Sequence, residues 1–533
     1  MRKYFYLSSI AVFAFVAWLA TSWPPILWSL FVLVPLFLVG LTDCLQTRHA
    51  VRRNFPIVGN FRYLLEGIRP EINQYFVESN TDGRPYNRED RNVVYQRAKR
   101  TLDTLPFGTQ RLVYQPGYEW LNHSMHAKPA ADPAPRVRIG GKDCDKPYEA
   151  SLLNISAMSF GSLSKNAIQA LNRGALMGGF AHNTGEGGLS PYHLGPGGDL
   201  IWQLGTGYFG CRDRLGGFDA VAFQERATLP QVKMVEVKLS QGAKPGHGGI
   251  LPGVKVTREI SEIRLVPMGH DVISPPAHSA FGTPRELLLF VQRLRELCGG
   301  KPVGIKLCLG SRTEFMSLCK AMVETGLRPD YIAVDGGEGG TGAAPLEFSN
   351  SIGTPLNDAL AFVHNALVGC DLREDLRLFA GGHIATGFHM ATKLALGADI
   401  CYAARAFMFS LGCIQALRCN TNHCPVGVAT QDPGLVKGLV VSDKSVRVKQ
   451  YHEGTVHALL ELIGAAGLDH PDELQPWHIY RRCSATDVRH YGQIYPQVEK
   501  GEILSGTPPG GFRFTWAHAS SERFGHYVEK TWH

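Results

Sequence analysis

Three cysteines lie close together in the second half of the sequence, at positions 413, 419 and 424. Their spacing is C-x5-C-x4-C, and thiolates crowded in this way are typical of a soft metal ion or an iron–sulfur cluster. A structural zinc site usually has four ligands, and His423 is adjacent to Cys424 and would point elsewhere. The alternative is three unrelated buried thiols. We predict that Cys413, Cys419 and Cys424 bind a cuboidal iron–sulfur cluster that lacks one iron.

A second group of candidate residues carries charge inside or beside glycine-rich segments. Glu186 lies in NTGEGG, Lys238 and Lys244 lie in KLSQGAKPG, and Lys306 falls in the apolar run VGIKL. An isolated lysine or glutamate is usually a solvated surface residue. These four residues fall instead at the ends of predicted strands, so they are candidates for binding or catalysis.

Alternating strands and helices must position these residues. From about residue 150, short apolar runs recur, and segments with helical spacing lie between them. Such alternation predicts a parallel barrel or a doubly wound sheet. In a barrel, the polar motifs at the carboxyl ends of the strands would meet in one active site. The predicted strands are residues 151–158, 178–185, 232–240, 301–308, 330–337, 376–382 and 398–405.

The last two strand–loop units before the cysteines have the features of a phosphate site. AGGHIATG spans residues 380–387, and ADICYAARAF spans residues 398–407. A barrel often holds a phosphate between its last two loops and a helix N-terminus. Gly381 and Gly382 would let backbone amides approach it, and Arg405 would add positive charge. Ordinary barrel turns are the alternative.

Six motifs in one order give the chain a resemblance to a known family. They are ISAMSFGSLS (155–164), NTGEGG (183–188), QGAKPGHGG (241–249), ISPPAH (273–278), DGGEGGTGAAP (335–345) and the cysteine segment (412–431). Over roughly residues 150 to 470, the chain resembles the glutamate synthases, which are iron–sulfur flavoproteins that make glutamate. The resemblance implies an α/β fold, the (β/α)8 TIM barrel, with bound FMN and a 3Fe-4S cluster held by the three cysteines.

The resemblance also implies roles for individual residues. A cation at Lys306 would stabilise the negatively charged edge of a reduced flavin. The implied cofactor-binding residues are Met158, Ser159, Gly161, Lys306, Asp335, Gly337, Gly381, Gly382 and Arg405. The implied catalytic residues, which would clamp a dicarboxylate and move protons to an imine, are Glu186, Lys238, Lys244 and Arg264.

The sequence departs from the family pattern in the substrate motifs. The family reads GAKPGEGGQLPG where this chain reads GAKPGHGGILPG. His247 therefore replaces an acid, and Ile250 replaces a glutamine that helps to hold 2-oxoglutarate. Leu189 and Ser190 replace an acidic pair after NTGEGG. The cofactor motifs are intact while part of the substrate pocket is changed.

The resemblance predicts an oxidoreductase that acts on CH–NH2 donors and reductively aminates a 2-oxo acid, as in the conversion of 2-oxoglutarate to L-glutamate. The sequence has no counterpart of the family's glutaminase domain or of an NADPH-binding fingerprint. We therefore expect ammonia as the nitrogen source and a separate electron donor, either a ferredoxin or a reductase subunit. The alternatives are an FMN and iron–sulfur oxidoreductase with another substrate, and a non-enzymatic electron-transfer protein at the membrane.

Composition narrows the class of protein. The chain has 533 residues, of which 19% are charged and 44% hydrophobic, so most of it should be globular. The net charge of +7 is spread out without a long basic run, which argues against nucleic-acid binding. The remaining cysteines are scattered, which favours a reducing compartment over a disulfide framework.

Two apolar runs open the chain, at residues 4–21 and 26–42. Each is about long enough to cross about 30 Å of hydrocarbon. A cleaved signal peptide is disfavoured because the second run follows at once. The turn between the runs is uncharged, and basic residues flank the pair on both sides: Arg2, Lys3, Arg48, Arg52 and Arg53. We therefore expect a hairpin in the inner (cytoplasmic) membrane, with the catalytic domain facing the cytoplasm.

These features divide the chain into four predicted segments. Residues 1–47 form the transmembrane hairpin, and residues 48–150 form an extended arm in which we find no chemistry. Residues 151–470 form the barrel with its cysteine loop, and residues 471–533 form a C-terminal extension.

Overall fold

The computed structural model describes residues 1–525 and divides into two compact units, Met1–Gly83 and Arg84–His533. The division falls within the segment predicted as the arm, so that the second half of the arm belongs to the same unit as the barrel. The four segment boundaries expected from the sequence stay predictions.

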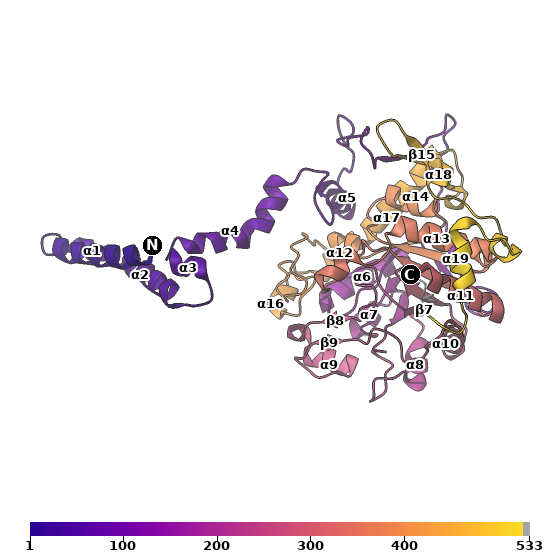
Figure 1. Ribbon diagram of the computed structural model, residues 1–533, viewed down its shortest axis with the longest axis horizontal. Helices are drawn as coiled ribbons and strands as arrows, with labels where there is room; N and C mark the ends of the chain where they lie inside the picture. Colours follow the sequence, from indigo (N-terminus) through magenta and orange to yellow (C-terminus); the bar gives the residue numbers. More distant parts are fainter. Residues whose placement is uncertain (526–533) are drawn as a thin grey trace, which may run out of the picture. The chain divides into compact units, whose positions relative to one another are not determined.

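The first unit is helical. α1 and α2 lie side by side within it (Figure 1), and Phe5 stacks on Phe37 with ring centroids 5.9 Å apart. The segments Arg2–Ala20 and Pro24–Leu45 are long and apolar enough to cross a membrane, with mean hydropathies of 1.5 and 2.2. Its helices are α1 (Arg2–Ala20), α2 (Leu30–Leu45), α3 (Ala50–Asn54) and α4 (Gly59–Ile72).

The second unit is built on a closed barrel of eight parallel strands. The barrel confirms the predicted TIM fold and excludes the doubly wound sheet. Its strands, in order around the barrel, are β4 (Leu153–Ile155), β5 (His182–Asn183), β6 (Leu200–Leu204), β7 (Val232–Lys238), β10 (Val303–Leu307), β11 (Tyr331–Asp335), β12 (Arg377–Gly381) and β13 (Ile400–Ala403).

The strand β6 is absent from the strands predicted from sequence, each of which contains one of the other seven. Its sequence, LIWQL, is only five residues long and carries a polar Gln203. The barrel buries that side chain, whose amide donates to the carboxylate of Glu236 on β7 at 2.7 Å. A short run with a polar residue is ambiguous in sequence, because its burial depends on a partner from another strand.

Helices cover the outside of the barrel, and the main hydrophobic core lies between them and the strands. Several of them are labelled around the strands in Figure 1. The amphipathic segments at 164–178, 283–299 and 445–467 form most of α6, α10 and α17. The covering helices are α6 (Lys165–Gly178), α8 (Ala220–Ala227), α10 (Pro284–Leu297), α11 (Arg312–Thr325), α13 (Leu356–Gly369), α14 (Gly387–Leu394), α15 (Arg405–Ser410) and α17 (Val441–Ala465).

A hairpin, β2 (Val137–Ile139) and β3 (Tyr148–Ala150), closes one end of the barrel. Ile139 and Ala150 are fully buried in a second core with side chains from the beginnings of the strands, such as Met234 and Ile400. The interior is therefore filled at the amino ends of the strands, which leaves the carboxyl ends for a site.

The remaining elements lie on the rim of the second unit. β8 (Ile250–Leu251) pairs with β9 (Val272–Ile273), and β1 (Glu119–Leu121) joins β14 (Ile479–Arg482) and β15 (Val488–His490) in a small sheet. The short helices are α5 (Arg88–Lys99), α7 (Pro191–Leu194), α9 (Arg258–Arg264), α12 (Leu346–Ser351), α16 (Pro433–Val436), α18 (Tyr491–Ile494) and α19 (Gly510–His518).

Candidate active site

Two of the predicted catalytic residues meet at the carboxyl ends of the strands. Lys238 is the last residue of β7, and Glu186 lies in the loop after β5. The Lys238 Nζ donates to Glu186 Oε1 at 2.9 Å and to Gln241 Oε1 at 2.7 Å. Gly205 and Gly249 leave room for the Glu186 carboxylate, because a Cβ at either position would collide with it.

The charges around Glu186 favour its ionised form. Burial opposes ionisation, but Lys238 outweighs it with help from Lys244, so the pKa of Glu186 lies below its ordinary value. Burial lowers the pKa of Lys244 to about 8, and its Nζ donates to the Ala343 carbonyl at 2.8 Å. Lys244 forms no ion pair with any residue of 1–525, so its charge is available to an anion.

A cavity of about 650 Å³ contains these side chains. Ile250, on β8, contributes an aliphatic group to the same wall as Lys238 and Lys244. The cavity also reaches the cysteine loop. Among the predicted site residues, its lining includes Met158, Ser159, Glu186, Lys238, Lys244, Arg405, Cys413, Cys419 and Cys424.

Arg264, the fourth predicted catalytic residue, lies behind this cavity. It ends α9, is 4% exposed, and donates from Nη2 to the Phe160 carbonyl at 2.9 Å. Its guanidinium also packs over the Phe209 ring at 5.2 Å. The side chain of His247 likewise turns aside and packs edge-on against Phe348 at 5.2 Å. A motif gives a position in the chain but not the direction in which the side chain points.

A smaller cavity of about 70 Å³ adjoins the first and contains the predicted phosphate site. Its glycine-rich wall joins the loop after β11 to the end of β12. Lys306 Nζ, which also lines the cavity, lies 3.4 Å from Asp335 Oδ1. A Cβ at Gly340 would lie 2.8 Å from Arg405 Cδ, so glycine allows the arginine to cross this wall. The predicted residues lining this cavity are Lys306, Asp335, Gly381, Gly382 and Arg405.

The residues of the two cavities fit a flavin with a phosphate tail. Gln241 lines both cavities, and its buried Nε2 lacks a partner within residues 1–525, which leaves a donor for a polar ring edge. The glycines allow a phosphate to approach the backbone closely, and Arg405 and Lys306 supply positive charge. Gly161 and Gly337, by contrast, lie outside the lining of both cavities as far as the structure describes them.

Tyr86 belongs to this site, although no sequence motif identifies it. It lines the smaller cavity. Its ring stacks on that of His383, which follows Gly382, with ring centroids 4.0 Å apart. The Arg405 guanidinium lies over the same ring at 4.9 Å. Asp90, on α5, pairs with the His383 Nε2 at 3.4 Å. A tyrosine in a charged segment without a motif carries no signal that could have identified it.

The same arm contacts the cysteine loop. The backbone N–H of Tyr86 donates to Gln415 Oε1 at 3.1 Å, and the Gln415 amide donates back to the Tyr86 carbonyl at 3.1 Å. Tyr95 donates from its hydroxyl to the Cys413 carbonyl at 2.6 Å. The segment after Arg84 therefore connects the loops that contain His383 and Arg405 with the loop that carries the cysteines.

The cysteine loop has an unusual backbone. Gln415, Leu417 and Asn422 adopt positive φ angles of 56°, 55° and 66°, which non-glycine residues rarely do outside functional sites. Within residues 1–525, no three His, Cys, Asp or Glu side chains are close enough to hold a single metal ion. A polynuclear cluster holds its cysteines farther apart than one ion does, so the predicted 3Fe-4S cluster stays a prediction.

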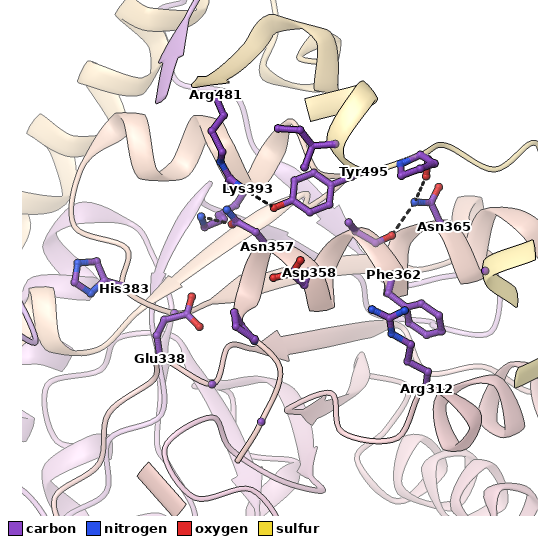
Figure 2. Close-up of a pocket in the computed structure, with 18 of the residues that line it drawn as sticks. Arg312, Glu338, Asn357, Asp358, Phe362, Asn365, His383, Lys393, Arg481 and Tyr495 are labelled. Carbon is purple, nitrogen blue, oxygen red and sulfur yellow. Dashed lines mark hydrogen bonds between the residues drawn. The ribbon is translucent and has the colours of Figure 1, made fainter. Parts of the chain in front are cut away.

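A third, open cavity of about 1230 Å³ lies on the outer side of these loops (Figure 2). It shares Gly382 and His383 with the phosphate cavity and contains Gly337. The Glu338 carboxylate accepts from the Leu356 backbone N–H at 3.0 Å and so caps α13. Its lining carries charges of both signs, from Arg312, Lys393 and Arg481 and from Glu338 and Asp358.

Comparison with known proteins gives a consistent result. Residues 123–469 match the family model described as the conserved region in glutamate synthase. The chain is 39% identical over 486 residues to the glutamate synthase large subunit-like protein YerD of Bacillus subtilis strain 168, covering 83% of this chain and 92% of that protein. It is 36% identical over 323 residues to the archaeal glutamate synthase [NADPH] of Methanocaldococcus jannaschii. That match covers 60% of each chain.

Among solved structures, a double mutant of flavocytochrome b2 with bound pyruvate resembles the chain with a TM-score of 0.41 and 13% identity, over 79% of this chain and 85% of that one.

Proposed function

The chain belongs to the glutamate synthase family, and on that premise we propose that it is an oxidoreductase that makes an amino acid from a 2-oxo acid and ammonia. One observation carries the proposal. A single cavity holds Glu186, Lys238 and Lys244 and adjoins a smaller, glycine-rich cavity. Two cations and one acid are the groups that a reaction of a 2-oxo acid with ammonia requires.

FMN is the proposed resident cofactor, and when bound it supplies hydride transfer to the substrate. Gly381, Gly382 and Arg405 would hold its phosphate, and Lys306 and Gln241 would contact its ring. Cys413, Cys419 and Cys424 would hold a 3Fe-4S cluster at the other end of the cavity. A separate reduced protein, a ferredoxin or a reductase subunit, would supply the electrons.

The proposed reaction balances as follows. Ammonia adds to the carbonyl carbon of the 2-oxo acid, and loss of water leaves a C=N bond. That bond takes up two electrons from the external donor and two protons, which gives the amino acid. Lys238 and Lys244 hold substrate carboxylate, and Glu186 orients ammonia and moves a proton to the imine nitrogen. The Lys238 ammonium, 2.9 Å from Glu186 Oε1, favours the ionised form of this carboxyl group against the effect of its burial.

The substrate is 2-oxoglutarate or a less polar 2-oxo acid. Ile250 lies in the cavity wall where the family has a glutamine, so a second carboxylate would lose one donor. This single residue is the reason to keep the second possibility, an FMN and iron–sulfur oxidoreductase of the same type that acts on another substrate.

We further propose that the first unit anchors the protein in the inner membrane, with the second unit in the cytoplasm. The two apolar segments and the basic residues on both sides of them support this orientation. An uncharged turn between the two helices fits passage through the membrane and back.

The experiment is anaerobic reduction of the purified protein, followed by addition of a panel of 2-oxo acids with and without ammonia. We expect flavin reoxidation only when both are present, and mass spectrometry should detect the corresponding amino acid. E186Q is the matched variant, because it keeps the shape of the side chain and should slow reoxidation. If no 2-oxo acid reoxidises the flavin in an ammonia-dependent manner, the proposal is wrong.

A further inference from the structure

Helix α4 carries a continuous apolar stripe that the rest of its unit leaves exposed. At 100° per residue, Phe61, Leu64, Leu65, Ile68 and Ile72 fall within about 100° of the helix circumference. Their exposed fractions are 38–60%. The stripe continues into the turn that follows, where Tyr75, Phe76 and Val77 are 55–85% exposed. Soluble proteins seldom expose a contiguous apolar surface of this kind without a partner for it.

The opposite face of α4 is already occupied. Tyr63 lies about 150° from the centre of the stripe and packs against α3, with the Arg52 guanidinium 4.3 Å from its ring centroid. It also contacts the ring of His49 at 4.8 Å. The orientation of α4 within the unit is therefore fixed by contacts on its polar side, which leaves the stripe directed away from the unit.

The arginines near the stripe and the position of α4 in the chain indicate what covers the stripe. Arg69 and Arg62 lie about 40° and 60° beyond one edge of the stripe, and Glu71 lies about 20° beyond the other edge. Three more arginines precede the helix, at positions 48, 52 and 53. The helix begins 14 residues after the end of α2, the second apolar segment. An amphipathic helix with arginines beside its apolar face is typical of a helix that lies in the interface of an anionic membrane.

We propose that α4 lies flat on the cytoplasmic membrane surface, with the stripe among the lipid acyl chains and the arginines at the phosphate groups. The occupant of the stripe is the phospholipid bilayer. The proposal rests on the membrane anchor proposed above, because the hairpin is what would hold α4 at the surface. It adds a second contact with the membrane, parallel to its plane.

The test uses the full-length protein in vesicles of phosphatidylethanolamine and phosphatidylglycerol. A photoreactive benzoylphenylalanine replaces Leu65 in one variant and Glu66 in a matched control. Glu66 is the next residue, is also exposed, and lies about 140° from the centre of the stripe. We expect crosslinking to lipid from position 65 at least several-fold above that from position 66. Flotation of the same vesicles reports separately whether the hairpin anchors the chain.

The outcomes separate the two proposals. If the chain floats with the vesicles but position 65 crosslinks to protein, the stripe is covered by the second unit or by another copy, and the α4 proposal alone is wrong. Equal lipid crosslinking from both positions, or none from either, also overturns it. If the intact chain does not float, the anchor proposal fails, and with it the basis for placing α4 at the membrane.

Discussion

Ile250 places an aliphatic side chain in the cavity that also holds the charged side chains of Glu186, Lys238 and Lys244. Replacing it with glutamine adds a donor for a substrate carboxylate or carbonyl. A hydrogen bond to a charged group contributes about 1.5–3 kcal/mol, which corresponds to roughly 10- to 150-fold in affinity. We predict that Ile250→Gln raises kcat/KM for 2-oxoglutarate with ammonia by a factor in this range.

The control for this prediction is Ile250→Leu, which keeps an aliphatic group of the same size and should leave kcat/KM for 2-oxoglutarate unchanged. High wild-type efficiency that the glutamine lowers would contradict the idea, since the pocket would then bind 2-oxoglutarate through other residues.

Lys244 should make substrate binding sensitive to pH. Burial lowers its pKa to about 8, so in the free protein the cation is present below pH 8 and is lost as the pH rises through that value. We predict that kcat/KM for an anionic 2-oxo acid falls above pH 8, because kcat/KM reports the free enzyme. In Lys244→Arg the fall should move to higher pH. If kcat/KM falls at the same pH in both proteins, a group other than Lys244 causes the fall.

The arm and the cysteine loop are the elements that complete the site. Tyr86 holds His383 and Arg405 through its ring, and each such contact contributes about 0.5–1 kcal/mol. We predict that Tyr86→Ala weakens FMN binding roughly 5- to 30-fold, measured by the fluorescence of released flavin. Tyr86→Phe keeps the ring and should retain FMN as the wild type does. Equal retention in both variants would mean that the arm does not support the cofactor.

The cysteine loop gives a prediction with an independent measurement. Cys419→Ser should lose or convert the iron–sulfur cluster, seen in iron content and the EPR signal, while flavin absorbance remains. Cys483→Ser is the control, because Cys483 is exposed and lies outside the cavity. Full iron content and an unchanged EPR signal in Cys419→Ser would show that this cysteine is not a ligand.

The elements that sequence predicts well are those whose residues act within one stretch of chain. Seven strands and the long helices follow from local apolar patterns, and glycine-rich loops mark the strand ends. The strand β6 and Tyr86 do not follow from such patterns. The buried Gln203 amide has its hydrogen-bond acceptor, Glu236, on another strand. The backbone N–H of Tyr86 donates to Gln415, which is more than 300 residues away in the chain. Such contacts are properties of the fold and leave no local signal.

At the scale of the whole molecule, the division at Gly83 predicts how the chain can be shortened. A chain of residues 84–533 keeps Tyr86 and α5 and should be soluble without detergent and retain FMN. A chain of residues 100–533 lacks Tyr86 and α5, and we predict that it loses FMN. Gel filtration with absorbance at the flavin and protein bands measures both. If the two truncated chains retain equal flavin, the arm is dispensable for the cofactor.

The β2–β3 hairpin determines the side from which small molecules can enter and leave the barrel. Because Ile139 and Ala150 fill the interior at the amino ends of the strands, everything that reaches the cavity must pass the opposite rim. In the proposed reaction, the oxo acid, ammonia and the amino acid product would therefore share one opening, which the cysteine loop and Pro85 border. A single opening favours an ordered reaction, in which the protein is first reduced by its electron donor and then passes the electrons to its substrate.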